Sequence, residues 1–112
     1  MKTILFLFLF VALTFSQELN ESSNLIKKKL PDIYSQILAS AKTDWGSDHR
    51  MIIYEVNRQC GALVDLSDLT KKHPVGTEEY TIIIQAASQW PNDYAMMLYE
   101  AKKQLKSYEA LK

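Results

Sequence analysis

Apolar side chains recur at spacings of three and four positions through much of the sequence, which is the pattern of helices that bury one face. The clearest stripe consists of Ile33, Tyr34, Ile37, Leu38 and Ala41. It predicts a helix from about Pro31 to Lys42, because proline suits the first turn of a helix. A shorter helix is predicted before it, over about 22–30, with side-chain oxygens in residues 21–24 available as caps.

The stretch from Trp45 to Leu66 is repeated at an offset of 45 positions, from Trp90 to Leu111. About 7 of 22 aligned positions are identical, where random pairing would give roughly one or two. The identical pairs are Trp45/Trp90, Asp48/Asp93, Met51/Met96, Tyr54/Tyr99, Glu55/Glu100, Gln59/Gln104 and Leu66/Leu111. Self-similarity at a fixed spacing indicates that each copy is one supersecondary unit that packs against the other.

Turn residues follow each tryptophan and predict that each copy is an antiparallel helical hairpin. Ser47 and Asn92 suit the N-cap of the second helix, which would place Asp48 and Asp93 in its first turn, where a negative charge is favourable. The second helices are predicted over about 48–66 and 93–111.

The predicted fold is therefore all-α: two homologous helical hairpins plus a short N-terminal helix. They would form an antiparallel four-helix bundle or a short helical-repeat array. The first repeat is expected over about 31–66 and the second over about 77–111. The linker between them, about 67–76, contains Pro74 and Gly76, which interrupt regular structure.

The beginning of the sequence predicts export. A lysine precedes an apolar run over residues 4–15, and the small residues Thr14 and Ser16 suit the positions before a cut, so residues 1–16 are predicted to be a cleaved signal peptide. The run is shorter than the about 20 residues that cross a bilayer comfortably. We therefore expect a secreted or periplasmic protein, with one all-α domain over 17–112 and no integral membrane segment after cleavage.

Charge and cysteine content narrow the functional classes. The sequence has 13 basic and 13 acidic side chains, and loss of Lys2 with the leader leaves 12 basic ones. This balance gives no electrostatic reason to expect nucleic acid as a partner. The single cysteine, Cys60, excludes an intrachain disulfide. It aligns with Leu105, so we expect a small buried apolar residue rather than a reactive thiol.

The second copy resembles a motif of small, mostly bacterial proteins, written approximately Trp-Pro-x-Asp-Tyr-x-Met followed by Tyr and then Gln. The matching residues are Trp90, Pro91, Asp93, Tyr94, Met96, Tyr99 and Gln104. The first copy departs from this motif at Gly46 and His49. The resemblance covers roughly half of the predicted mature chain, and it implies neither a reaction nor a substrate.

The repeated tryptophans have two interpretations. In the structural one, each indole closes its hairpin, the following aspartate caps the second helix, and the methionine and tyrosine pack inward. This interpretation predicts that Trp45 and Trp90 are substantially buried. In the functional one, Trp45 and Trp90 are exposed binding anchors. The duplication favours the structural interpretation, because both copies must solve the same packing problem.

The residues show no recognisable catalytic constellation. His49 and Met51 are soft ligands that suit copper(I), but positions two apart on a helix do not share a face. Glu55 and Glu100 could form a carboxylate pair, yet neither is followed by the histidine three residues on that di-iron sites use. We expect no enzyme, metal or cofactor.

Three function classes remain open. The first is a module that binds another protein or has a structural role. The second is a small-ligand or metal carrier that uses the bundle interior, and the third is a minor hydrolase. An exposed aromatic patch, an internal cavity or clustered carboxylates, respectively, would distinguish them.

Overall fold

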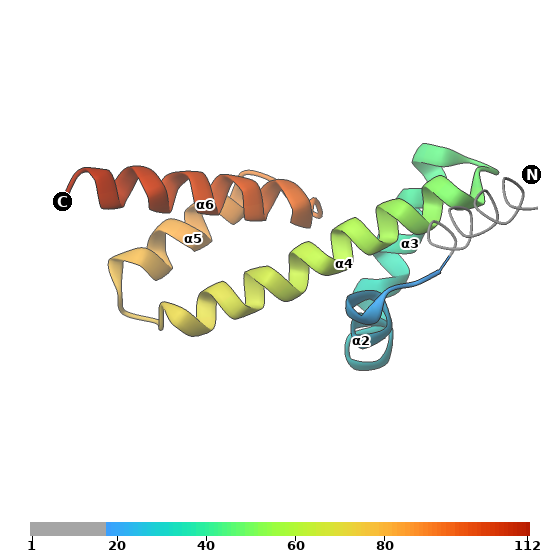
Figure 1. Ribbon diagram of the computed structural model, residues 1–112, viewed down its shortest axis with the longest axis horizontal. Helices are drawn as coiled ribbons and strands as arrows, with labels where there is room; N and C mark the ends of the chain where they lie inside the picture. The colour runs from blue at the N-terminus through green and yellow to red at the C-terminus, as the bar shows by residue number, and fades with distance from the viewer. Residues whose placement is uncertain (1–17) are drawn as a thin grey trace, which may run out of the picture. The chain divides into compact units, whose positions relative to one another are not determined.

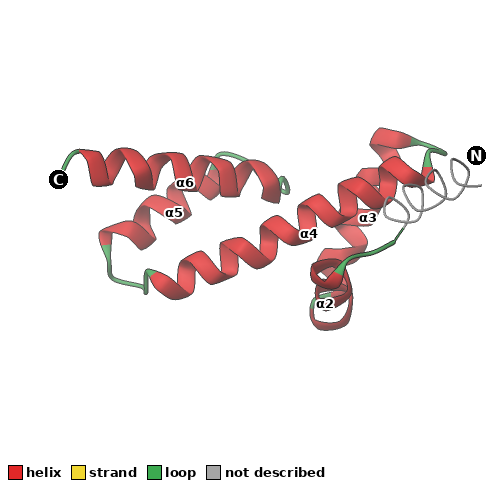
Figure 2. Cartoon of the chain, viewed as in Figure 1, coloured by secondary structure: helices red, strands yellow, loops and turns green. Residues whose placement is uncertain are grey.

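The computed structural model describes residues 18–112, and in this part of the chain every regular element is a helix (Figures 1 and 2). The elements are α2 (Glu21–Lys29), α3 (Pro31–Trp45), α4 (His49–Lys72), α5 (Glu78–Ser88) and α6 (Tyr94–Ala110). The prediction of an all-α fold is confirmed. The predicted signal peptide over 1–16 and the expected start of the mature chain at Gln17 lie outside the described residues.

The chain divides into two compact units, one ending at Asn57 and the other running from Arg58 to Lys112. Helix α4 crosses this boundary, so its first part belongs to the first unit and its second part to the second unit. Each unit therefore contains three helical segments with buried side chains of their own.

In the first unit, capping and proline chemistry separate α2 from α3. Asn20 caps α2, since its side chain accepts a hydrogen bond from the Ser23 N–H at 2.9 Å. Pro31 then opens α3, as the sequence predicts, and the two helices pack on each other. Among residues 18–57, the buried side chains are Ser23, Ile26, Tyr34, Ile37, Ala41, Ile52 and Val56.

One polar side chain of α4 fixes the beginning of the described chain. The Asn57 Oδ1 accepts from the Asn20 N–H at 2.9 Å and from the Ser23 hydroxyl at 2.7 Å. The Asn57 Nδ2 donates to the Glu18 carbonyl oxygen at 2.9 Å. Ser23 is fully buried, and these bonds satisfy its hydroxyl group. Helix α2 and the residues just before it are thereby tied to α4 by the hydrogen bonds of one side chain.

The second unit is organised around a small apolar cluster contributed by α4, α5 and α6. Its buried members are Leu66, Ile83, Ala86 and Ala101. Leu69, Tyr94, Met97, Leu98 and Leu105 are partly buried and pack against it. The alanines allow close approach, and α5 and α6 lie directly against each other.

Helix α4 is longer than the sequence predicts. It continues through Leu66 to Lys72, so the first part of the expected linker over 67–76 is helical. Leu69 lies one turn after Leu66 and packs on the same cluster. This apolar contact stabilises the extension of α4 beyond Leu66. The helix stops where Pro74 disfavours helical geometry at His73. Thr77 then caps α5 by accepting from the Tyr80 N–H at 3.2 Å.

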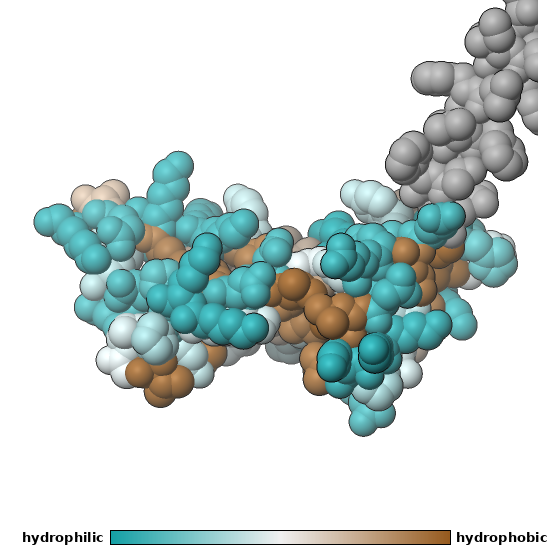
Figure 3. Space-filling model, turned by 60° about the horizontal axis from the view of Figure 1, so that its bottom comes forward, coloured by the Kyte–Doolittle hydropathy of each residue, from teal (hydrophilic) through white to brown (hydrophobic). Residues whose placement is uncertain are grey.

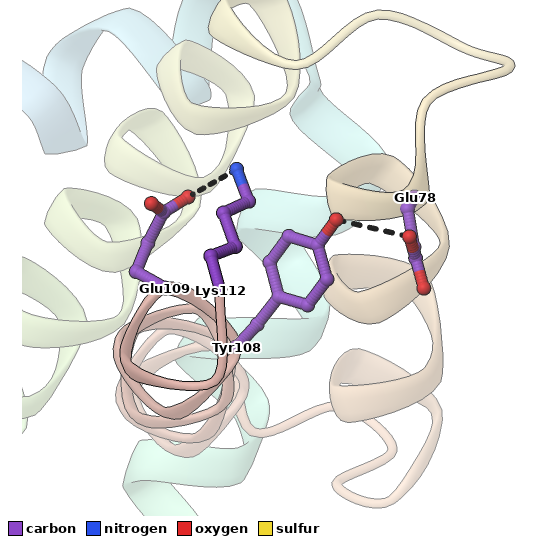
Figure 4. A network of polar contacts seen from close by, with 4 residues as sticks. All are labelled: Glu78, Tyr108, Glu109 and Lys112. Atoms are coloured by element: carbon purple, nitrogen blue, oxygen red, sulfur yellow. Dashed lines mark hydrogen bonds and ion pairs between the residues drawn. The ribbon is translucent and has the colours of Figure 1, made fainter.

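One hydrogen bond joins the first residue of α5 to the last turn of α6, and an ion pair lies at the end of α6 (Figure 4). The Tyr108 hydroxyl donates to the Glu78 carboxylate at 2.9 Å, and the Lys112 ammonium pairs with Glu109 at 3.1 Å. The hydrogen bond to the Glu78 carboxylate raises the pKa of Tyr108, because loss of its proton would place two negative charges together.

Candidate functional site

The candidate site is the corner between the helices of each copy, and its hydrogen bonds repeat at the predicted offset. The Asp48 N–H donates to the Trp45 carbonyl oxygen at 3.0 Å, and the Asp93 N–H donates to that of Trp90 at 3.1 Å. The carboxylates of both aspartates then accept, each at 3.2 Å, from the N–H of the methionine three residues on, Met51 or Met96. The two copies therefore have the same local structure at these positions.

The aspartates are the N-caps of the second helices, as the structural interpretation of the motif predicts, and the other assignment, with Ser47 and Asn92 in this position, is wrong. Helix α4 begins directly after Asp48, and α6 begins directly after Asp93. Asn92 has a φ of 64°, in the left-handed region, whereas an N-cap residue is usually extended. A carboxylate at the N-cap both accepts a hydrogen bond and places negative charge against the helix dipole.

The two corners reach this geometry by different backbone paths. In the first, Gly46 has a φ of 58° and ends α3 directly after Trp45. In the second, proline occupies the equivalent position 91 and cannot adopt a positive φ. The left-handed residue is therefore Asn92, one position later, and α5 has already ended at Ser88. Asparagine tolerates this conformation better than most residues.

The indoles of the corner lie at the surface, and the prediction that they are substantially buried is wrong. Trp45 is 42% exposed and Trp90 is 37% exposed. Trp45 is the last residue of α3, and Trp90 lies beyond the end of α5. Both rings are therefore attached where the packed helices stop, so neighbouring side chains cover each of them only in part.

The tyrosines of the motif are also exposed, in contrast to the expected inward packing. Tyr54 is 58% exposed and Tyr99 is 60% exposed. Tyr54 stands two positions from the buried Ile52 and Val56, and positions two apart lie on opposite sides of a helix. Tyr99 has the same relation to the buried Ala101. Met51 and Met96, with Glu55 and Glu100, are partly buried.

The glutamines of the motif differ sharply between the copies. Gln59 is only 8% exposed, and its amide lies at the start of α6. Its Nε2 donates to the Asp93 Oδ1 at 3.1 Å, and its Oε1 accepts from the Ala95 N–H at 3.1 Å. Gln104, the equivalent residue of the second copy, is exposed. Gln59 thus completes the capping of α6 from a neighbouring helix.

Cys60 is fully buried, as its alignment with Leu105 predicts. Asn57 is the residue with an organising role that the sequence did not indicate. Its counterpart in the second copy is Lys102, so the duplication contains no signal for it.

Nothing in the described part of the chain assembles a metal or membrane site. Within residues 18–112, no group of three or more His, Cys, Asp and Glu side chains could hold a metal ion. None of the helices described there is both long enough and apolar enough to span a bilayer.

Comparisons with protein-family models, curated proteins and solved structures found no match.

The two capping aspartates provide a direct test of the corner geometry. We expect Asp48→Ala to lower the free energy of unfolding by about 1 kcal/mol, the usual cost of losing an N-cap. Asp93→Ala should cost about 2 kcal/mol, because it also removes the acceptor of the buried Gln59 amide. Urea denaturation of both variants measures the difference. Equal costs would show that the Gln59 bond adds nothing to the cap.

Proposed function

We propose that the protein is an exported protein-interaction module whose repeated Trp and Tyr side chains contact a partner protein. The observation that carries this proposal is that both copies expose the same two aromatic residues to nearly the same degree: 42% and 37% for Trp45 and Trp90, and 58% and 60% for Tyr54 and Tyr99. Export rests on the leader pattern of residues 1–16.

Physical chemistry supports aromatic side chains as the contact residues. Tryptophan and tyrosine are enriched among the residues that dominate binding energy, because they bury large apolar areas and lose little rotamer freedom. Single exposed apolar residues are ordinary on protein surfaces. A Trp and Tyr pair presented alike by two copies is more specific, because the repeated sequence keeps both residues at equivalent positions.

The corner does not depend on the indoles for its backbone geometry, which leaves them available for contact. Main-chain bonds and the Asp carboxylates hold the turns. Apolar side chains also reach the surface of both units on the face drawn in Figure 3. The large hydrophobic residues that are exposed include Leu25, Leu30 and Ile84.

The test is crosslinking in the native host with mass spectrometry, followed by binding measurements on Trp45→Ala and Trp90→Ala. We expect each substitution to weaken partner binding by about thirtyfold, which corresponds to about 2 kcal/mol. The melting temperature should fall only slightly, because each indole is already partly exposed. Val75→Ala is the matched control, since Val75 is 79% exposed and lies in a loop away from either tryptophan in sequence.

Two outcomes separate the interpretations. If the tryptophan variants lose the partner and melt nearly like the wild type, the indoles form a binding surface. If they melt far lower and the surviving folded protein binds as before, the indoles have a structural role and the proposal is wrong.

A further inference from the structure

The glutamine and the aspartate that hydrogen-bond to each other in the second unit each have an equivalent residue in the other copy. These equivalents, Gln104 and Asp48, do not form the corresponding contact within the described chain. Inside the second unit, the buried Gln59 side chain bridges to Asp93 and to the Ala95 N–H. The corresponding Gln104 is exposed, and no hydrogen bond within residues 18–112 involves its side chain. The same contrast separates Leu66, which is 8% exposed, from Leu111, which is 87% exposed.

The complementary half lies at the first corner. Asp48 has the same capping geometry as Asp93, but its carboxylate is exposed. Among the described residues, it accepts a side-chain hydrogen bond only from the Met51 N–H. The Arg50 N–H occupies the position of the Ala95 N–H at the start of its helix, where main-chain donors have no partner within the helix. This corner therefore offers the acceptor and donor that Gln59 uses at the second corner.

We propose that α6 of one molecule docks on the Asp48 corner of a second copy of this chain. In this contact, the Gln104 Nε2 donates to Asp48, and its Oε1 accepts from the Arg50 N–H, as Gln59 does with Asp93 and Ala95. The contact of Gln59 with the second corner is thus the model for the contact of Gln104 with the first corner of another molecule. The two surfaces differ, so the contact is head-to-tail, and it continues into longer assemblies unless a ring closes.

Charge alone does not select this pairing. The exposed surface of α6 around Gln104 carries Lys102, Lys103 and Lys106. The corner carries the exposed carboxylates of Asp44 and Asp48, but the exposed Lys42 and Arg50 of the same segment balance their charge. The contact is therefore specified by the hydrogen bonds of Gln104 rather than by net charge. The inference is independent of the tryptophan surface, because it uses neither Trp45 nor Trp90.

Sedimentation velocity over a range of protein concentrations tests the proposal. The sample is the full protein isolated from its host, after any natural processing. Wild-type protein should show a mass that rises with concentration beyond that of a dimer. Gln104→Glu should weaken association about tenfold, because it sets a carboxylate against Asp48. Adding Asp48→Asn should restore association, since asparagine can donate to the new carboxylate and remains a good N-cap.

Gln85→Glu is the matched control, because Gln85 is exposed on α5 and has no place in the contact. It should associate like the wild type. Circular dichroism at low concentration should show the wild type and all three variants folded. Protein that stays monomeric at every concentration, or a Gln104→Glu variant that associates normally, would overturn the proposal.

Discussion

Ile83→Ala is expected to lower the free energy of unfolding by about 2–5 kcal/mol, the cost of removing a large apolar side chain from a packed core. Ile83 is 1% exposed and belongs to the cluster that joins α4, α5 and α6. Relaxation of the surroundings recovers only part of this cost, because Ala86 and Ala101 are too small to fill the space, although Met97 and Leu98 pack against the same cluster and can shift toward it. The expected loss is a large fraction of the total free energy of unfolding of a domain of this size.

The next residue provides a matched control for this prediction. Ile84 is 46% exposed, so Ile84→Ala removes the same atoms from a site already in contact with water. It should cost less than about 1 kcal/mol. Chemical denaturation followed by circular dichroism measures both variants. Similar losses for the two positions would mean that the buried face of α5 is assigned incorrectly.

Gln59→Leu is expected to destabilise the protein by about 2–3 kcal/mol, although leucine has a similar size and is more apolar. The substitution leaves the Ala95 N–H and one position of the Asp93 carboxylate without their partner. Gln59 is 8% exposed, so water replaces the lost bonds poorly. The apolar gain of leucine offsets only part of this cost.

The duplication supplies the control for this second prediction. Gln104→Leu makes the same chemical change at the equivalent position of the other copy, where the side chain is exposed. Measured at a concentration too low for association, it should change stability by no more than about 0.5 kcal/mol. If both leucine variants were equally stable, the buried amide of Gln59 would have no energetic role.

The sequence alone determined the helical elements and several of their ends. Apolar spacing of three and four predicted α3, Pro31 marked its start, and the alignment of Cys60 with Leu105 predicted burial of the thiol. These features are local: helix periodicity, proline geometry and capping depend on residues within a few positions of one another. Even so, the sequence left two assignments for the N-cap at both corners, because a serine or asparagine and an aspartate in succession offer competing caps, and the structure shows that the aspartate is the cap.

Only the tertiary structure decided which of two chemically equivalent residues is buried. Gln59 and Gln104 have the same place in the repeat, but one is enclosed where α4 meets α6 and the other is exposed. The exposure of Trp45 and Trp90 was likewise set by where the packed helices end, and the role of Asn57 by residues far away in sequence. Burial depends on which surfaces meet in space, and sequence periodicity identifies a helix face without identifying what covers it.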